Sequence, residues 1–351
     1  MFPAMRLFRH HTEIPVEARG AVIALGNFDG LHLGHQRVIG EALRLAAELE
    51  APCGVLTFEP HPRAYFQPDQ PAFRLTPFRI KLRQLDAMGL DYVYLLAFDR
   101  ALAARSPESF IVEVLGQGLE PAHVVVGYDF VFGKGRSGNA ALLSDLGRAA
   151  GFGVTSVTAV ADPEGVIYSS TKVREHLAAG DPAGAARLLG RPWEIEGRVE
   201  TGDKRGRLLG FPTANVALAD YLLPALGVYA VKAGIDEGRG TRWIDGVANL
   251  GRRPTVGGTR VQLETHLFDF SGDLYGRHLR VALIDFIRPE RKFESLDALK
   301  AQIAADSAEA RLRLAAYDGP PPAHVQPRLR PRRVDRPAES VYESALKPQR
   351  K

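Results

Sequence analysis

The stretch GNFDGLHLGH, residues 26–35, directly follows the apolar run AVIAL at residues 21–25. The apolar run is typical of a buried strand, and residues 35–50 have the spacing of an amphipathic helix. The glycine-rich stretch therefore brings His32 and His35 to a strand-to-helix turn. Such a turn lets backbone N–H groups approach an anion at the positive end of a helix, so we expect a phosphate contact here. The spacing of the two histidines also leaves metal binding open.

The alternation of strand and helix continues through the first half of the chain. Short apolar runs at 54–58, 92–97, 123–127 and 154–160 are separated by helical patterns at 77–88, 107–116 and 140–150. This order predicts a parallel α/β sheet, whose ligands bind at the carboxyl ends of the strands. The segment FEPHP, residues 58–62, follows the second strand and belongs at the same edge.

Residues 169–181, SSTKVREHLAAGD, predict a short helix that Ser170 or Thr171 caps and Gly180 ends. Hydroxyl groups at a helix N-terminus, with Arg174 one turn further on, suit the binding of a polyphosphate. A simple helix cap, with no ligand, is the alternative interpretation.

The secondary-structure pattern of the sequence changes near residue 191. From there to about 287, β-rich segments alternate with glycine-rich turns, which predicts a small antiparallel barrel or sandwich. A last helical pattern covers residues 295–316. We therefore expect a first domain at 1–187 and a second at 188–318. Residues 319–351 contain seven prolines and few large apolar side chains, which predicts a disordered, basic, proline-rich tail.

The net charge of +4 is concentrated in that tail. Its eight Lys and Arg residues against three Asp and Glu leave a net charge of −1 on the rest of the chain. The charge therefore does not indicate a nucleic-acid-binding body, although RLRPRRVDR at 328–336 leaves weak binding of RNA or an acidic partner as a hypothesis. No apolar run of membrane-spanning length and no signal peptide is evident, and the lone Cys53 is typical of a small buried side chain. We expect a cytoplasmic protein that acts on small molecules.

Four motifs of the first half together carry a family resemblance. They are GNFDGLHLGH, FEPHP, GYDFVFGKGRSG at 127–138 and SSTKVR at 169–174. In this order they resemble the FMN adenylyltransferase module of the bacterial bifunctional riboflavin kinase/FAD synthetase family. HxGH alone also occurs in other nucleotidyltransferases, including class I aminoacyl-tRNA synthetases. In the second half, four more segments resemble the riboflavin kinase module: LGFPTANV (209–216), VANLGRRPTVGG (247–258), LETHLFDFSGDLYG (263–276) and IRPERKF (287–293).

The resemblance implies a Rossmann-like nucleotidyltransferase domain with a parallel sheet, then an antiparallel β-barrel kinase domain with a C-terminal helix. The barrel would phosphorylate riboflavin with ATP to give FMN, with Glu264 as general base. Thr213 and Asn215 would hold Mg²⁺ and the ATP phosphates, and Gly210 would close a glycine-rich loop, TGDKRGRLLG, over the nucleotide. Arg291 is a candidate flavin or phosphate contact. Without the resemblance, PTAN is typical of a turn and Glu264 of a solvent-facing strand residue.

The first half would then join FMN to the AMP part of a second ATP, giving FAD and pyrophosphate. The FMN phosphate is an ionised nucleophile, so alignment and charge stabilisation suffice. The resemblance assigns the ATP phosphates to His32, His35, Ser170, Thr171 and Arg174, the nucleotide also to Gly26, Phe28 and Asp129, and the flavin to His61. Two alternatives remain: a monofunctional member with one active half, or another HxGH nucleotidyltransferase. The sequence does not predict the oligomeric state.

Overall fold

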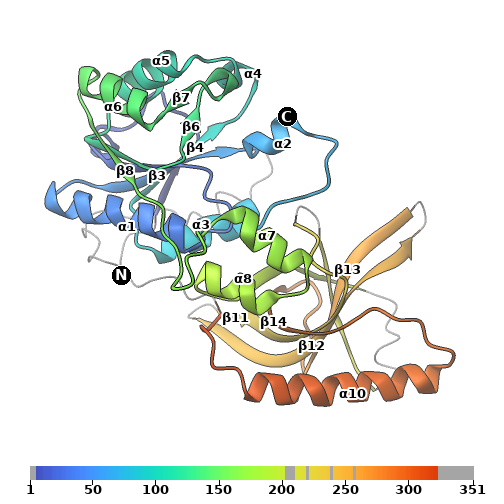
Figure 1. Ribbon diagram of the computed structural model, residues 1–351. Coiled ribbons are helices and arrows are strands. Elements are labelled where there is room, and N and C mark those ends of the chain that lie inside the picture. Colours follow the sequence, from blue (N-terminus) through green and yellow to red (C-terminus); the bar gives the residue numbers. More distant parts are fainter. Residues whose placement is uncertain (1–4, 202–209, 219–220, 238–239, 256–257, 323–351) are drawn as a thin grey trace. The chain divides into compact units, whose positions relative to one another are not determined.

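The computed structural model describes residues 5–201, 210–218, 221–237, 240–255 and 258–322, without the side chains of 253–260. These residues form two compact units (Figure 1). The α/β unit comprises the described residues up to Pro71 and Phe78–Tyr168; the barrel unit comprises Ala72–Pro77 and the described residues from Ser169 onward. The domain boundary expected after residue 187 falls inside a helix, α8 (Pro182–Leu189). Packing groups that helix with the barrel. The predicted tail from residue 323 onward lies outside the described residues.

The α/β unit is built on one six-stranded sheet in which all neighbouring strands run parallel. The strand order is β1-β4-β3-β2-β5-β8. The strands are β1 (Arg6–Phe8), β2 (Val22–Leu25), β3 (Cys53–Glu59), β4 (Tyr92–Ala97), β5 (His123–Gly127) and β8 (Gly153–Val157). Five of these strands confirm the predictions from apolar runs. The sequence did not predict β1, because three residues carry no readable periodicity.

Helices cover both faces of this sheet (Figure 1). On one face lie α1 (Leu33–Glu48) and α3 (Phe78–Ala87); on the other lie α6 (Ala140–Ala149) and a π-helix, η2 (Phe110–Leu119). Val22 and Ala24 of β2 pack with the first pair of helices, and Ile23 and Leu25 pack with the second. The shorter elements are η1 (Val16–Ala18), α2 (Pro62–Phe66), α4 (Arg100–Ala103), α5 (Pro107–Ser109), β6 (Val131–Phe132), η3 (Lys134–Arg136) and β7 (Gly138–Asn139). Because β2 is buried on both faces of the sheet, the run AVIAL that contains it is apolar throughout.

Strand β2 lies at the point where the strand order reverses. From β2 the chain crosses to β3 on one side, and β5 lies on the other side. Parallel sheets bind ligands outside the carboxyl ends of their strands at such a point. The turn GNFDGLHLGH runs from the end of β2 into α1. The fold therefore places the predicted phosphate-binding turn where a ligand is expected.

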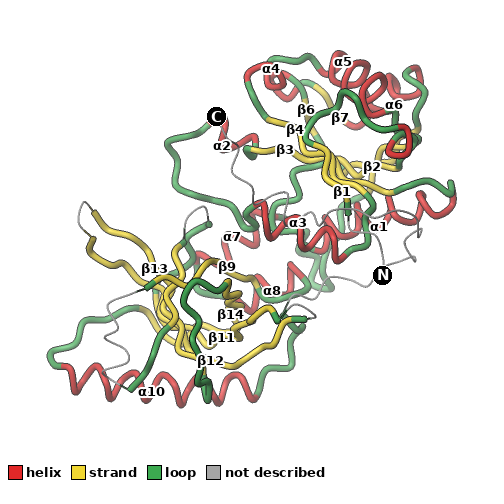
Figure 2. The backbone as a smooth tube through the Cα atoms, turned by 180° about the vertical axis from the view of Figure 1, so that it is seen from behind, coloured by secondary structure: helices red, strands yellow, loops and turns green. Residues whose placement is uncertain are grey.

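The barrel unit contains six antiparallel strands that close into a barrel (Figure 2). They are β9 (Trp193–Glu200), β10 (Ala214–Ala217), β11 (Gly227–Asp236), β12 (Thr241–Thr255), β13 (Gly258–Leu267) and β14 (His278–Pro289). The ring β10-β13-β12-β11-β14 closes because β9 pairs with both β10 and β14. Of the two sequence-based alternatives, barrel and sandwich, the structure has the barrel. The predicted last helix is confirmed as α10 (Leu296–Ala315), whose Ala310 and Leu314 pack on the outer face of the barrel.

Helix α7 (Ser170–Ala178) shows one error in the sequence analysis. Its N-cap is Ser169, whose hydroxyl accepts a hydrogen bond from the Lys172 N–H at 3.2 Å. The capping prediction for Ser170 or Thr171 was wrong, because three consecutive hydroxyl residues are equally good caps and only the backbone decides where the helix begins. Gly180, in a left-handed conformation just past the helix, ends it as predicted.

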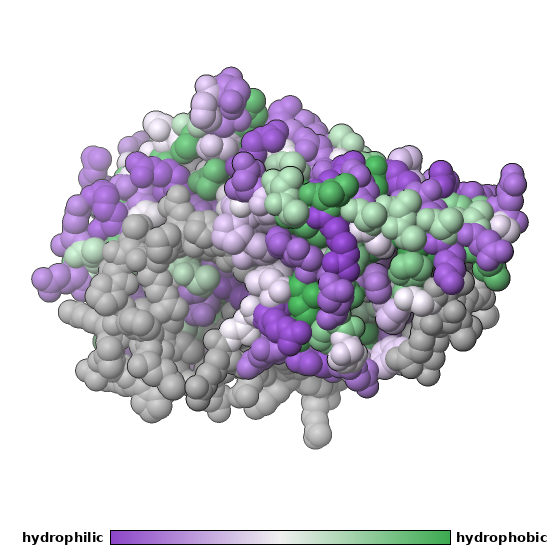
Figure 3. Space-filling model, turned by 90° about the horizontal axis from the view of Figure 1, so that it is seen from below, coloured by the Kyte–Doolittle hydropathy of each residue, from purple (hydrophilic) through white to green (hydrophobic). Residues whose placement is uncertain are grey.

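The surface of the described residues is mixed in character. Among them, no helix combines the length and the apolar character needed to cross a bilayer. On the face drawn in Figure 3, hydrophobic residues are interspersed with hydrophilic ones. Single exposed apolar side chains of this kind are ordinary and need no partner.

Candidate functional site

The turn after β2 brings His32 and His35 together at the start of α1. His32 caps the helix, because its Nδ1 accepts a hydrogen bond from the His35 N–H at 3.3 Å. The two imidazole rings stack with their centroids 3.7 Å apart. Accepting at Nδ1 leaves the ring proton of neutral His32 on Nε2, where it is a donor suited to a phosphate oxygen. The described residues contain no group of three or more His, Cys, Asp or Glu that could hold a metal ion.

Gly26 and Phe28 shape the same turn. A Cβ on Gly26 would lie 3.1 Å from the Phe28 ring, so only glycine leaves that ring its place. The Phe28 ring meets His35 edge-on at 5.3 Å, and its backbone takes a left-handed conformation, with φ of 51°. Such strain in a non-glycine residue is maintained by its surroundings and collects at functional sites. Gly26 thus leaves room for the Phe28 ring, which packs against His35. The contacts of both residues with a nucleotide stay predictions.

Asp129 lies just beyond the end of β5, next to β2 in the sheet. It is exposed within a tight turn, in which the Phe130 N–H donates to the Gly127 carbonyl at 3.1 Å. The Phe130 and Phe132 rings stack 5.4 Å apart, and Phe132 packs in the core. The aromatic pair anchors the hairpin and leaves the carboxylate at the carboxyl edge of the sheet.

The FEPHP segment carries an aromatic cluster that the sequence analysis missed. His61 caps α2, since its Nδ1 accepts from the Arg63 N–H at 3.1 Å. Helix α2 then places Tyr65 and Phe66 against Phe98, which follows β4, with ring centroids 5.4 and 5.7 Å apart. Phe66 is 64% exposed. Phe98 lies more than thirty residues from α2 in the sequence, so no local pattern could have joined the two.

In the barrel unit, Arg174 projects from α7 to residues 72–77. Its Nε donates to the Phe73 carbonyl at 2.9 Å, and its guanidinium lies 5.4 Å from the centre of the Phe73 ring. Ser170 and Thr171 form the first turn of α7. The structure thus gives Arg174 a structural contact that the sequence did not predict, and its assignment to phosphate stays a prediction.

Glu264 on β13 lies between two asparagines of the neighbouring strands. It is opposite Asn215 on β10 and opposite Asn249 on β12. Directly opposed residues of antiparallel strands share a face, with Cβ atoms roughly 4.5–5.5 Å apart, so both amides flank the carboxylate. Asn215 is in turn opposite Glu200 on β9. Asn249 lies in the motif VANLGRRPTVGG, but only the strand register shows that it neighbours Glu264.

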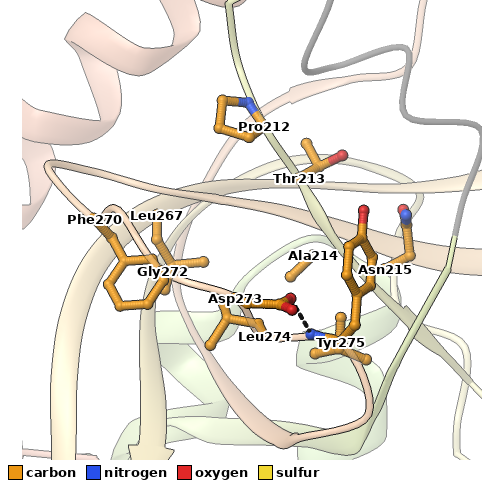
Figure 4. A pocket seen from close by; sticks show the side chains of 11 residues that line it. Pro212, Thr213, Ala214, Asn215, Leu267, Phe270, Gly272, Asp273, Leu274 and Tyr275 are labelled. Atoms are coloured by element: carbon orange, nitrogen blue, oxygen red, sulfur yellow. Dashed lines mark hydrogen bonds between the residues drawn. The ribbon is translucent and has the colours of Figure 1, made fainter.

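A small cavity of ≈ 80 Å³ lies beside the start of β10 (Figure 4). Its lining includes Thr213, Asn215 and Tyr275, and the polar ends of Asn215 and Tyr275 point to the same side of it. The Asp273 carboxylate accepts from the Tyr275 N–H at 3.0 Å and fixes that loop. Ligand pockets usually measure roughly 300–1,000 Å³, so the cavity that the described residues enclose is smaller than an ordinary ligand pocket. Gly210 has a left-handed φ of 87°, and residues 202–209 of the predicted loop lie outside the described part.

Arg291 follows β14 and is tied to α10. Its guanidinium bonds the Gln302 side chain and lies 4.9 Å from the centre of the Phe293 ring. Gln302 donates to Asp306 at 2.7 Å, and Asp306 pairs with Arg288. This chain of contacts joins the predicted flavin contact to the barrel wall.

Known protein families match both halves of the chain. A family model for FAD synthetase matches residues 14–172, and one for riboflavin kinase matches residues 189–314. The bifunctional riboflavin kinase/FMN adenylyltransferase of Escherichia coli K12 is 45% identical over 308 residues, covering 88% of this chain and 97% of that protein. The protein of the same name from Bacillus subtilis strain 168 is 40% identical over 307 residues, covering 86% and 94%. The crystal structure of a protein called a macrolide-efflux protein, from Streptococcus pneumoniae, aligns with a TM-score of 0.77 at 30% identity, over 88% of this chain and 99% of that one.

The fold and the two sites define a nucleotide-dependent transferase in which a nucleotidyltransferase-type α/β unit precedes a kinase-type barrel. The chain belongs to the bifunctional riboflavin kinase/FMN adenylyltransferase family. Both the FAD synthetase and the riboflavin kinase domain are present. The family resemblance of the motifs is therefore confirmed.

Proposed function

We propose that this chain phosphorylates riboflavin in the barrel unit and adenylylates the resulting FMN in the α/β unit, with one ATP for each step. The observation that carries the proposal is that both family models match one chain that also contains the site motifs of both reactions. A decayed half would not need to keep His32 as a helix cap or Glu264 between two amides.

In the kinase step, Glu264 takes the proton from the 5′-hydroxyl of riboflavin as that oxygen attacks the γ-phosphorus of ATP, and ADP leaves. Asn215 and Thr213 offer the oxygen ligands that Mg²⁺ prefers, and Mg²⁺ usually keeps few protein ligands alongside substrate phosphates. These two residues would hold the ion, which neutralises charge on the phosphates when bound. Asn215 is 7% exposed and opposite two glutamates, a setting that favours a cation.

In the adenylyl step, an oxygen of the FMN phosphate attacks the α-phosphorus of ATP, and the bond to the bridging oxygen of pyrophosphate breaks. Negative charge builds on the leaving group. His32, through Nε2–H, and His35 stabilise that charge at the positive end of α1. Ser170, Thr171 and Arg174 belong to the other compact unit, and their assignment to these phosphates rests on the sequence motif alone. Asp129 faces the same sheet edge as the histidines and would contact the nucleotide.

The aromatic cluster beyond β3 and β4 would receive the flavin ring. An isoalloxazine is flat with an extended π-system, and stacking on Tyr or Phe side chains is favourable. Phe66 offers an exposed ring, and Tyr65 and Phe98 hold it in place. His61, which caps the same helix, is the nearest predicted flavin contact.

The test is a time course of the purified protein with riboflavin, ATP and Mg²⁺, with the flavins resolved by chromatography. FMN that appears first and then gives way to FAD supports both activities. FMN that accumulates, or FAD that forms only when FMN is supplied in place of riboflavin, supports the monofunctional alternative. No flavin product from either substrate would overturn the proposal in favour of another HxGH nucleotidyltransferase. Omitting Mg²⁺ should stop both steps.

We further place the enzyme in the cytoplasm, where ATP is supplied, with small molecules as its partners. One cysteine, buried in β3, fits a reducing compartment. The hypothesis of RNA binding by residues 328–336 lies outside the described residues.

A further inference from the structure

A buried lysine lies behind the turn that carries the two histidines. Lys81 belongs to α3 and is 3% exposed. Its Nζ donates to the carbonyl of Asn27, in the middle of GNFDGLHLGH, at 2.8 Å. Burying an ammonium group is unfavourable unless it is bonded, so a lysine in this position has a specific partner to hold. No motif of the sequence analysis contains Lys81.

A second donor reaches the same carbonyl. The hydroxyl of Thr57, a fully buried residue of β3, donates to the Asn27 oxygen at 3.2 Å. A carbonyl oxygen has two lone pairs, so Lys81 and Thr57 can fill both. In a trans peptide the N–H points opposite to the C=O, so the Phe28 N–H is directed away from these two donors. Donors on the carbonyl polarise the peptide and make its N–H a stronger donor.

The conformation of the turn requires this support. Phe28, Gly30 and Leu31 all have positive φ angles, of 51°, 85° and 46°. Gln36 of α1 holds the far side of the turn by donating to the Leu31 carbonyl at 2.9 Å. Lys81 and Thr57 hold the near side. The acidic side chain in the same turn, Asp29, is itself buried.

We propose that Lys81 is a positioning residue for the ATP phosphates in FMN adenylylation. It fixes and polarises the Asn27–Phe28 peptide, so that the Phe28 N–H donates to a phosphate oxygen beside His32, and it adds positive charge behind the turn. This inference rests on the proposed adenylyltransferase function.

The test is steady-state adenylylation from FMN and ATP, with pyrophosphate as product inhibitor. Lys81→Met removes the charge but keeps an apolar stem of similar length. Loss of a hydrogen bond from a charged group should raise the KM for ATP and the inhibition constant of pyrophosphate by roughly tenfold. The KM for FMN should not change, and Lys81→Arg should restore most of the binding. Thr57→Val, which removes only a neutral donor, should have a smaller effect.

Two controls accompany these variants. Arg148→Met removes one positive charge from the exposed end of α6 in the same unit and should leave all constants unchanged. Riboflavin phosphorylation, which we place in the other unit, shows whether each variant was purified in an active form. If Lys81→Met does not fold, Lys81→Leu, which also has neither charge nor donor, replaces it.

Unchanged constants for ATP and pyrophosphate in a folded Lys81→Met or Lys81→Leu protein would overturn the inference and leave the proposed function intact. An equal rise in the KM for FMN, not rescued by arginine, would also overturn it, because that is the signature of a general structural defect. A wild-type protein that makes no FAD would overturn both the function and the inference.

Discussion

At the scale of the residue, His32 has a structural role and a proposed chemical role, and a substitution can separate the two. Its Nδ1 caps α1, while Nε2 is the predicted phosphate donor. Asparagine is also a good N-cap. His32→Asn should therefore keep the thermal midpoint but lower FMN adenylylation on the order of 100-fold, with riboflavin phosphorylation unchanged. His32→Ala should lose both the cap and the activity, and a His32→Asn protein with full adenylylation would show that the ring is not needed.

Asn249 and Glu264 offer a second residue-scale prediction. The register places the amide directly opposite the carboxylate, so Asn249 should orient the proposed base. Asn249→Ala should lower kcat for riboflavin phosphorylation about tenfold with little change in either KM. In single-turnover measurements, the same substitution in a Glu264→Gln protein should cost nothing further, because the two act as one unit. Additive losses would contradict the pairing. FAD formation from FMN is the internal control.

Protonation of the half-buried His123 gives a third prediction at this scale. Burial lowers the pKa of His123 below its ordinary value of 6.5, although Glu41 opposes the shift. The unfolded chain then binds the proton more readily, so the stability of the α/β unit should fall as the pH drops through 6.5. His123 bonds Thr155 at 2.8 Å, and glutamine can keep that bond without titrating. Thermal midpoints measured from about pH 7.5 to about 5.5 should fall less for His123→Gln than for the wild type.

At the scale of the element, helices α7 and α8 belong to the barrel unit although they precede the riboflavin kinase match. Leu177 of α7 accepts a backbone bond from Ala225, and Gly180 lies against Phe286 of β14. A fragment 169–322 should therefore melt several degrees above a fragment 188–322, measured by the loss of riboflavin phosphorylation on heating. Equal midpoints would show that the two helices add nothing to the barrel.

The same scale shows what a sequence can and cannot predict. Apolar runs such as AVIAL predicted the parallel strands, because burial on both faces leaves no polar positions. Helix α8 was not predicted, since Asp181 and Pro182 at its start are equally typical of a turn. HxGH and PTAN were visible as local patterns. Lys81, Asn249 and Phe98 were not, because each meets its site through a fold contact between residues distant in the sequence.

At the scale of the whole molecule, the net positive charge lies in residues 319–351, apart from the candidate site residues. The riboflavin kinase match ends at residue 314, and no candidate site residue lies beyond it. Truncation after Asp318 should leave kcat and KM of both reactions unchanged and should abolish retention on a cation exchanger at low salt. Loss of RNA retention on truncation would support the hypothesis for residues 328–336. Slower flavin kinetics would show that the tail serves catalysis.

The barrel unit also contains six residues from the first half of the chain. Trp193 donates to the Leu75 carbonyl at 2.8 Å, the Leu222 N–H donates to the Arg74 carbonyl at 2.8 Å, and Arg174 donates to Phe73. Recombination between two related genes at a single crossover near residue 188 would give Trp193 and Leu222 a different parent from Leu75 and Arg74. In chimeras joined near residue 188, residues 72–77 of one parent would pack against the barrel of the other. This protein can therefore exchange its halves with a relative only if residues 72–77 come from the same parent as the barrel.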